Sequence, residues 1–158
     1  MRRSTTATKT GEGRGRRRAG AAFGDVNRDG RLDFFVSTFD VVGNLFASAN
    51  KLYANLGGRK FEEVADAWGV TDSSWGWGAV FIDPDNDGWL DLLVTNGYPY
   101  VAQGIETNSP PNLITDATTD RTRFFHNDGS TMIESGQLWG VNDTGEGYGV
   151  TVLDYDND

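Results

Sequence analysis

The chain has 158 residues, a formal net charge of −9, a single histidine and no cysteine. Its length suits one hydrophobic core, and the absence of cysteine excludes disulfide bonds. No apolar run approaches the roughly 18 residues of a membrane span. Glycine is frequent, at 21 residues, and proline is scarce, at 4, which is typical of an all-β protein rich in turns.

Residues 1–18 differ from the rest of the chain in charge. They hold about +6, which leaves about −15 on residues 19–158. Because this segment has almost no large apolar side chains, it is predicted to be a disordered basic tail. The acidic body argues against nucleic-acid binding, although a contact of the tail with nucleic acid or an anionic surface stays open. The pair Arg2-Arg3 is not followed by an apolar segment, so no secretion signal is predicted.

An acidic loop of nine residues is the most informative feature of the sequence. It occurs as DVNRDGRLD at 25–33 and as DPDNDGWLD at 83–91, and it begins again as DYDND at 154–158. Such crowded carboxylates repel one another, by roughly 4 kcal/mol for two charges about 4 Å apart at an effective dielectric near 20. A bound divalent cation removes this repulsion. Gly30 and Gly88, at the sixth position, are expected to allow the sharp turn that folds the loop around the ion.

The expected ligands are side-chain oxygens at positions 1, 3, 5 and 9 and the backbone carbonyl of position 7. They are Asp25, Asn27, Asp29, Arg31 and Asp33; Asp83, Asp85, Asp87, Trp89 and Asp91; and Asp154, Asp156 and Asp158. Ligation by oxygen alone favours Ca²⁺ over zinc or copper. An EF-hand is excluded because position 12 is Val36 or Val94 and the flanks have the length of strands. An Asx-rich turn without metal is the alternative, which the repetition of the ligand positions disfavours.

The similarity between copies extends beyond the loops. Trp68-Gly69-Val70 matches Trp139-Gly140-Val141, and Gly76-Trp77-Gly78 matches Gly147-Tyr148-Gly149. The sequence therefore predicts repeat units at about 19–76 and 77–147, with a truncated third at 148–158. The expected strands of the second unit are about 77–82, 90–95, 122–126 and 131–135, with an extended loop over 97–121 where the first unit has the shorter 39–49.

Units of four strands with a period above about 40 residues predict blades of a β-propeller. A solenoid of sheets is the alternative. A closed propeller needs at least about four blades, whereas this chain holds about two and the start of a third. The sequence is therefore interpreted as a fragment, with the remaining blades of the same polypeptide as its neighbours.

Two further groups of residues invite a functional interpretation. The paired Asp residues suggest a glycosidase, but the metal loops account for every clustered Asp, and no nucleophile pattern surrounds His126, which is interpreted as a strand residue. Of the tryptophans that can stack on sugars, Trp75 and Trp89 are the better candidates for exposure. Trp68 and Trp139 recur in register, which favours packing within the blades.

The segments FGDVNRDGRLDF at 23–34 and WGWGAVFIDPDNDG at 75–88 resemble FG-GAP or VCBS-type repeats, and the second is similar to the cartilage acidic protein (ASPIC/UnbV) group. The resemblance covers residues 19–158. It implies a seven-bladed propeller like that of integrin alpha subunits, Ca²⁺ between strands, and a role in adhesion or ligand binding. Asn27, a neutral ligand, and Arg28, which replaces a small residue, suggest weaker binding at the first loop.

Together these features predict a calcium-binding propeller module without catalytic residues. Its loops would bind a protein or carbohydrate ligand, and it would work outside the cytoplasm, at the cell surface or in the periplasm. The alternative is the propeller portion of a larger extracellular enzyme, a lyase, hydrolase or dehydrogenase, whose catalytic residues lie outside this chain.

Overall fold

The computed structural model describes residues 18–38, 49–73, 76–96, 121–145 and 147–153. Strands are the only regular elements of these residues, and no helix among them is long and apolar enough to cross a membrane. Several predictions fall outside this part of the chain: the basic tail up to residue 17, the loop at 97–120, Trp75 and the third acidic loop at 154–158.

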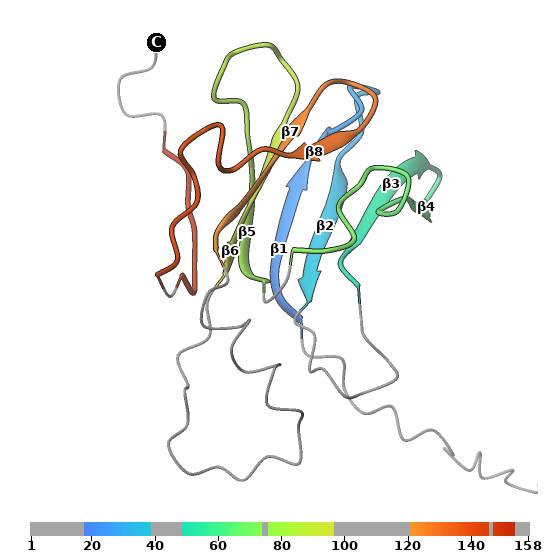
Figure 1. Ribbon diagram of the computed structural model, residues 1–158. Helices are drawn as coiled ribbons and strands as arrows, with labels where there is room; N and C mark the ends of the chain where they lie inside the picture. The colour runs from blue at the N-terminus through green and yellow to red at the C-terminus, as the bar shows by residue number, and fades with distance from the viewer. Residues whose placement is uncertain (1–17, 39–48, 74–75, 97–120, 146, 154–158) are drawn as a thin grey trace, which may run out of the picture.

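The described strands form two four-stranded antiparallel sheets (Figure 1). The first sheet contains β1 (Arg18–Gly24), β2 (Asp33–Thr38), β3 (Lys51–Gly57) and β4 (Lys60–Glu63), in this order. The second contains β5 (Gly76–Ile82), β6 (Asp91–Asn96), β7 (Arg123–Asn127) and β8 (Met132–Glu134), again in chain order. The predicted all-β fold class, with blade-like units as in part of a β-propeller, is therefore confirmed, and the acidic loops at 25–33 and 83–91 each join the first two strands of their sheet.

The two sheets repeat one another in register. Phe23 pairs with Phe34 and Phe34 with Tyr53, as Phe81 pairs with Leu92 and Leu92 with Phe125. At the outer hairpin, Asn55 pairs with Phe61 as Asn127 pairs with Met132. Equivalent positions of the two sheets can therefore be compared residue by residue. Where their burial or contacts differ, the cause is the surroundings of the sheet, because the strand pairing is the same.

The hydrophobic core lies between the sheets. The first sheet and the segment after it contribute Ala22, Val26, Phe35, Leu52, Ala65 and Val70, and the second sheet contributes Phe81, Leu92, Val94, Phe125 and Met132. Fully burying a side chain of this size stabilises a fold by about 1.5–3 kcal/mol. Residues of both sheets therefore contribute to one shared core.

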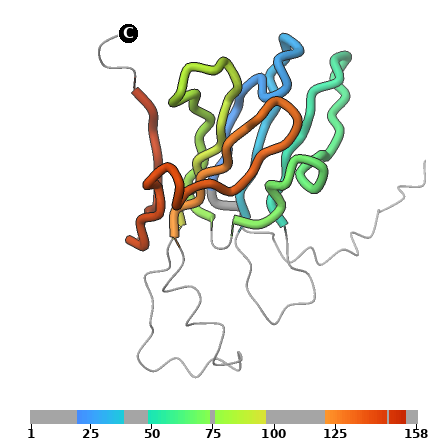
Figure 2. The backbone as a smooth tube through the Cα atoms, turned by 45° about the horizontal axis from the view of Figure 1, so that its top comes forward, coloured from blue at the N-terminus to red at the C-terminus, as the bar shows by residue number. Residues whose placement is uncertain are grey.

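The first strands of successive units lie side by side (Figures 1 and 2). A Cβ atom at Gly20 of β1 would overlap the backbone of β5 at Trp77, and one at Gly78 of β5 would lie 3.1 Å from Gly149 and Val150 of the following segment. The hydroxyls of Ser37 and Thr95 accept hydrogen bonds from the N–H of Gly20 and Gly78, at 2.9 Å in both cases. A similar close approach is thus repeated between the second unit and residues 147–153, which is consistent with successive blades of a propeller.

The outward face of the first sheet is covered with aromatic rings. Phe34 stacks on Tyr53 with ring centroids 4.6 Å apart, and it also contacts Phe23 and Phe61. Phe23 is 69% exposed, whereas the equivalent Phe81 in the second sheet is 9% exposed and packs against the first sheet. The face that is buried in the second sheet is therefore open in the first.

The tight turn after the fourth strand accounts for the repeated Trp-Gly-Val sequence. Gly69 and Gly140 have positive φ angles of 72° and 70°, and Val70 and Val141 donate equivalent backbone hydrogen bonds. Trp68 is partly buried against the core between the sheets. Trp139 stays exposed and contacts Phe124 and His126 on the far side of the second sheet.

Candidate cation-binding loops

The two acidic loops share one backbone conformation. Gly30 and Gly88 at position 6 have φ angles of 83° and 85°, as their predicted role requires. Arg28 and Asn86 at position 4 also have φ of 57°, a left-handed conformation that the sequence did not indicate. Asparagine adopts this conformation readily, whereas arginine does so at a cost.

Backbone N–H groups gather the side-chain oxygens inside each loop. In the first loop, the N–H of Asp29 donates to both Asp25 Oδ1 and Asn27 Oδ1, at 3.0 and 3.1 Å. In the second loop, the N–H of Asp87 donates in the same way to Asp83 and Asp85. Two oxygens that share one donor must lie close together, so the structure brings positions 1 and 3 to the same point, as the sequence predicted.

Position 5 lies beside this point, and its carboxylate accepts the N–H of position 7. Asp29 accepts from Arg31 at 2.9 Å, and Asp87 accepts from Trp89 at 2.7 Å. These bonds have the i to i+2 pattern of an Asx turn. The residues at positions 3 and 5 are exposed or partly exposed, so an ion can reach them from solvent.

The ninth residue of each loop is buried, and its carboxylate accepts backbone hydrogen bonds that connect the loop to the third strand of its sheet. Asp33 accepts the N–H of Asn55 at 2.7 Å and the N–H of Val26 at 3.1 Å, which ties the loop to β3. Asp91 accepts the N–H of Asn127 at 2.7 Å in the same way. Burial raises the pKa of both carboxyl groups, against the lowering effect of these N–H donors.

The loops differ in charge. The first holds three carboxylates and two guanidinium groups, whereas the second holds four carboxylates and no cationic side chain. The guanidinium of Arg31 forms an ion pair with Asp29. The side chain of Arg28 extends from the first loop to the second, where its guanidinium carbon lies over the ring of Trp89, 5.1 Å from the ring centroid. Trp89 is therefore half-buried and has one face covered by Arg28, so it is a poorer platform for sugars than the sequence suggested.

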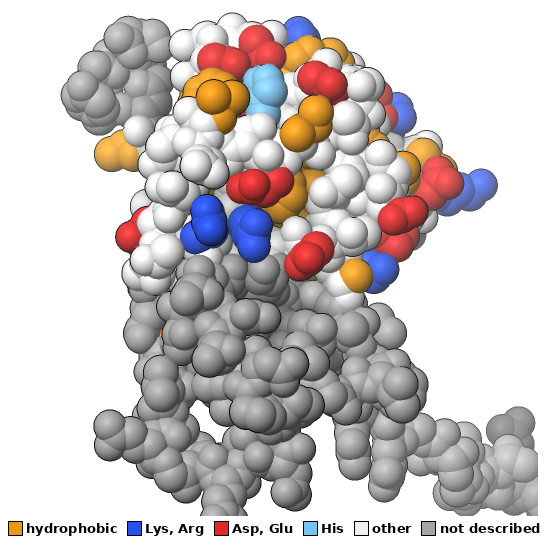
Figure 3. Space-filling model, in the orientation of Figure 1, with side chains coloured by type: hydrophobic (Ala, Val, Ile, Leu, Met, Phe, Trp, Pro, Cys, Tyr) orange, Lys and Arg blue, Asp and Glu red, His pale blue; other side chains and the backbone are white. Residues whose placement is uncertain are grey.

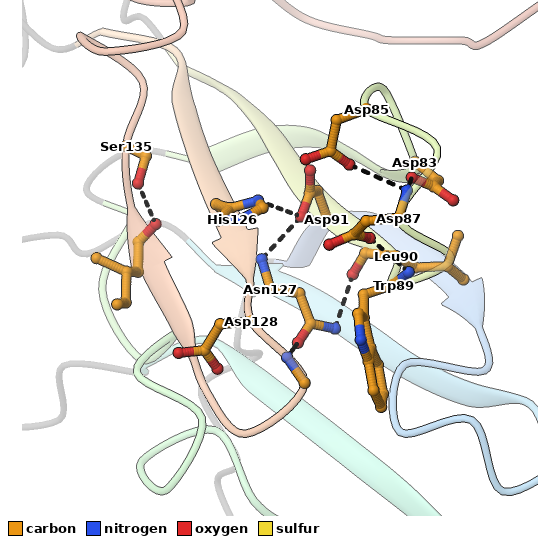
Figure 4. A network of polar contacts seen from close by, with 12 residues as sticks. Asp83, Asp85, Asp87, Trp89, Leu90, Asp91, His126, Asn127, Asp128 and Ser135 are labelled. Atoms are coloured by element: carbon orange, nitrogen blue, oxygen red, sulfur yellow. Dashed lines mark hydrogen bonds and ion pairs between the residues drawn. The ribbon is translucent and has the colours of Figure 1, made fainter.

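A histidine from a neighbouring strand, which the sequence did not assign to the site, lies beside the second loop. His126 of β7 has its Nδ1 3.1 Å from Asp91 Oδ1, and one of its ring nitrogens lies within 4.8 Å of carboxylate oxygens of Asp85 and Asp87 (Figure 4). Acidic side chains lie on either side of the histidine on the molecular surface (Figure 3). One difference between the repeats could have indicated this role: the residue before the repeated asparagine is Ala54 in the first unit and His126 in the second.

The donor sets fit a hard cation in both loops. Positions 1 and 3 share a backbone donor in each, positions 3 and 5 of the second loop lie close together, and one oxygen of Asp91, Oδ2, is buried without any hydrogen-bond partner. Asp154, Asp156 and Asp158, the predicted ligands of the third loop, lie outside the described residues.

Fold and loops define a β-propeller-type repeat protein. Comparison with known families finds an FG-GAP-like repeat at residues 38–94. This region begins at the last residue of β2 and ends within β6, so it spans the end of one sheet and the start of the next. The FG-GAP-like repeat is a structural module and not a catalytic domain. No curated protein matches the chain.

Proposed function

We propose that this chain is a calcium-stabilised segment of a β-propeller with a non-catalytic role in binding or adhesion, of the ASPIC/UnbV and integrin-alpha-like type. The observation that carries the proposal is the same convergent arrangement of oxygens in two loops of equivalent sheets. Ca²⁺ takes six to eight oxygen ligands, and it can use side-chain oxygens of positions 1, 3 and 5 together with a backbone carbonyl and water.

In this proposal the ion is structural. It holds the turn between the first two strands of a blade, and the ninth residue ties that turn to the third strand. Extracellular calcium modules bind the ion at about 10⁻⁴–10⁻³ M, a concentration that is available outside cells and not in the cytosol. The proposed location is therefore extracellular, at the cell surface or in the periplasm.

The proposed neighbours are further blades of the same kind. The aromatic face formed by Phe23, Phe34, Tyr53 and Phe61 corresponds to the face of the second sheet that the first sheet buries. An exposed apolar face of this extent is typical of a surface that another element covers. The ligand, a protein or a carbohydrate, would be bound by loops of the assembled propeller.

A thermal melt of the full chain, after treatment with EDTA and then with CaCl₂, tests the calcium proposal. At free calcium about tenfold above the dissociation constant, we expect stabilisation of about 1.4 kcal/mol, or a rise in melting temperature of about 3–5 °C. Asp85→Asn should reduce this rise, because it removes charge from the exposed centre of the second loop. Asp66→Asn removes the same charge outside both loops and is the control. If the melting temperature of the unchanged chain is the same in EDTA and in CaCl₂, the proposal is contradicted.

A further inference from the structure

The second loop has a nitrogen donor that the first loop lacks. His126 lies one residue before Asn127, and the equivalent residue of the first sheet, one before Asn55, is Ala54. A ring nitrogen of His126 and carboxylate oxygens of Asp85 and Asp87 all lie within 4.8 Å of one another. No such group of three forms in the first loop within the part of the chain that the structure describes.

An independent observation marks the same place as incomplete. In the first loop, the N–H of Val26 donates to Asp33 Oδ2 at 3.1 Å. The equivalent residue of the second loop is Pro84, which has no N–H to donate. Asp91 Oδ2 is consequently left without a hydrogen-bond partner on a side chain that is only 1% exposed. A buried charge of this kind is unfavourable unless an opposite charge nearby, such as a bound cation, compensates it.

Asp91 lies beside this group of three residues without belonging to it. The negative charge of Asp85 contributes to the raised pKa of Asp91. Asp91 Oδ1 lies 3.1 Å from the Nδ1 of His126 and orients the ring, as carboxylates do for metal-binding histidines. Asp85 and Asp87 are exposed, so their side chains can close the cluster by changing rotamer.

We propose that Asp85, Asp87 and His126 bind a divalent transition-metal ion of the Zn²⁺ type, with water in the remaining position and Asp91 orienting the histidine ring. Mixed imidazole and carboxylate ligation suits Zn²⁺, whereas Ca²⁺ takes oxygen ligands alone. A tetrahedral Zn²⁺ with bonds near 2 Å holds its ligands about 3.3 Å apart, which requires only a modest approach of the exposed side chains. The inference rests on the proposed function only in that the second loop is a cation site, and it makes the two loops chemically different.

The single histidine is a built-in probe for this site. The full chain, freed of metal with a chelator, is titrated with ZnCl₂ while the ring nitrogens of His126 are followed by ¹⁵N NMR. The expected result is saturation at one Zn²⁺ per chain with a large shift of one ring nitrogen. Ring resonances that do not respond to Zn²⁺ would overturn the proposal.

Three variants separate the ligands from the general acidity of the surface. His126→Ala copies the residue of the first sheet and should weaken Zn²⁺ binding by about tenfold or more. Pro84→Ala restores an N–H that can donate to Asp91 Oδ2, which draws negative charge from the carboxylate that orients His126, so it should also weaken binding while the fold is kept. Asp29→Asn, in the first loop, is the matched control and should leave Zn²⁺ affinity unchanged. Equal affinity of His126→Ala and the unchanged chain would refute the site.

Calcium stabilisation is read separately, from the melting temperature of His126→Ala in CaCl₂ without zinc. If this variant is stabilised by calcium while Zn²⁺ leaves His126 of the unchanged chain unaffected, the zinc inference fails and the calcium proposal stands. If Zn²⁺ shifts the His126 resonance while calcium changes no melting temperature, the zinc inference stands and the calcium proposal fails.

Discussion

Within the first acidic loop, an arginine takes part of the role that a bound cation would have. Arg31 forms an ion pair with Asp29, the carboxylate at position 5, and both side chains are partly open to solvent. A cation that binds this loop must compete with the guanidinium. In the second loop, the residue equivalent to Arg31 is the uncharged Trp89, so no guanidinium at this position competes with an ion for Asp87.

Replacing this arginine should strengthen calcium binding to the first loop. Because an exposed ion pair contributes about 0.2–1 kcal/mol, Arg31→Ala is expected to raise calcium affinity by up to about fivefold. Isothermal titration in an Asp87→Asn background, which weakens the second loop, measures the effect. Lys60→Ala removes one positive charge from a strand outside the loops, so an equal gain in both variants would contradict a local role of Arg31.

The residues of the candidate site were predictable only as far as their spacing is local. Positions 1, 3 and 5 converge because they belong to one turn, and the glycine at position 6 marks that turn. The sequence did not indicate the left-handed Arg28 or the contact of His126 with Asp91. The second of these depends on the pairing of β6 with β7, which are joined through the long segment 97–120, so no spacing along the chain encodes it.

At the scale of the elements, one asparagine at the end of β7 connects the two sheets. The buried amide of Asn127 donates to the carbonyl of Leu90 in its own unit at 3.1 Å and to that of Val26 in the first unit at 3.0 Å. Asn55 makes the equivalent bond within its unit, to the carbonyl of Leu32 at 3.0 Å, but it is only half-buried. The same residue type therefore has an additional role where a neighbouring sheet is present.

Truncating the two asparagines should separate these roles. Asn127→Ala leaves buried carbonyls without a donor and is expected to lower the free energy of unfolding by about 2–3 kcal/mol. Asn55→Ala should cost about 1 kcal/mol or less, since water can reach the groups that it leaves. Urea unfolding of the two variants gives the comparison. Equal losses would mean that the bond to Val26 adds nothing across the sheets.

A second element-scale feature links β4 to β3. Glu63 accepts the N–H of Ala65 at 2.9 Å and pairs with Lys51 at 3.0 Å. Burial raises the pKa of Glu63, but these two partners outweigh it and hold the pKa below its usual 4.5. With a lowered folded pKa, the contribution to stability is present above about pH 4.5 and is lost as pH falls through the folded pKa.

Glu63→Gln is therefore expected to be less stable than the unchanged chain at neutral pH and equally stable in acid. The side chain is partly exposed, so the difference at neutral pH should be about 0.5 kcal/mol. Unfolding by urea at a series of pH values follows it. Glu62→Gln, which removes a carboxylate from the same strand but neither contact, is the control, and a difference for Glu63→Gln that persists in acid would exclude the ionised pair as its source.

At the scale of the whole molecule, the repeat made the fold predictable. Two copies of one pattern fixed the four strands of each unit, because acidic turn, apolar strand and Trp-Gly-Val turn recur in the same order. The predicted strands of the second unit agree with β5 to β8 to within one or two residues. Which face of a sheet is buried did not follow from either copy alone, because Phe23 and Phe81 are the same residue type in opposite environments.

The close approach of successive units depends on glycine at one repeated position. A Cβ at Gly20 would overlap the carbonyl oxygen of Trp77 and lie 2.9 Å from the backbone nitrogen of Ala79, and backbone atoms cannot turn aside as a flexible side chain can. Gly149 holds the equivalent position in the following segment, and a Cβ there would meet nothing within 4 Å in the described structure.

Alanine substitutions at these two glycines therefore test the packing of unit on unit with identical chemistry. Gly20→Ala should force β1 away from β5 and cost about 1–3 kcal/mol, the range found for overpacked cores. Gly149→Ala should change the free energy of unfolding by no more than about 0.5 kcal/mol. Urea unfolding measures both. If Gly20→Ala were as stable as Gly149→Ala, the two sheets would not be held at the distance seen in this structure, and the arrangement of the units as adjacent blades would be wrong.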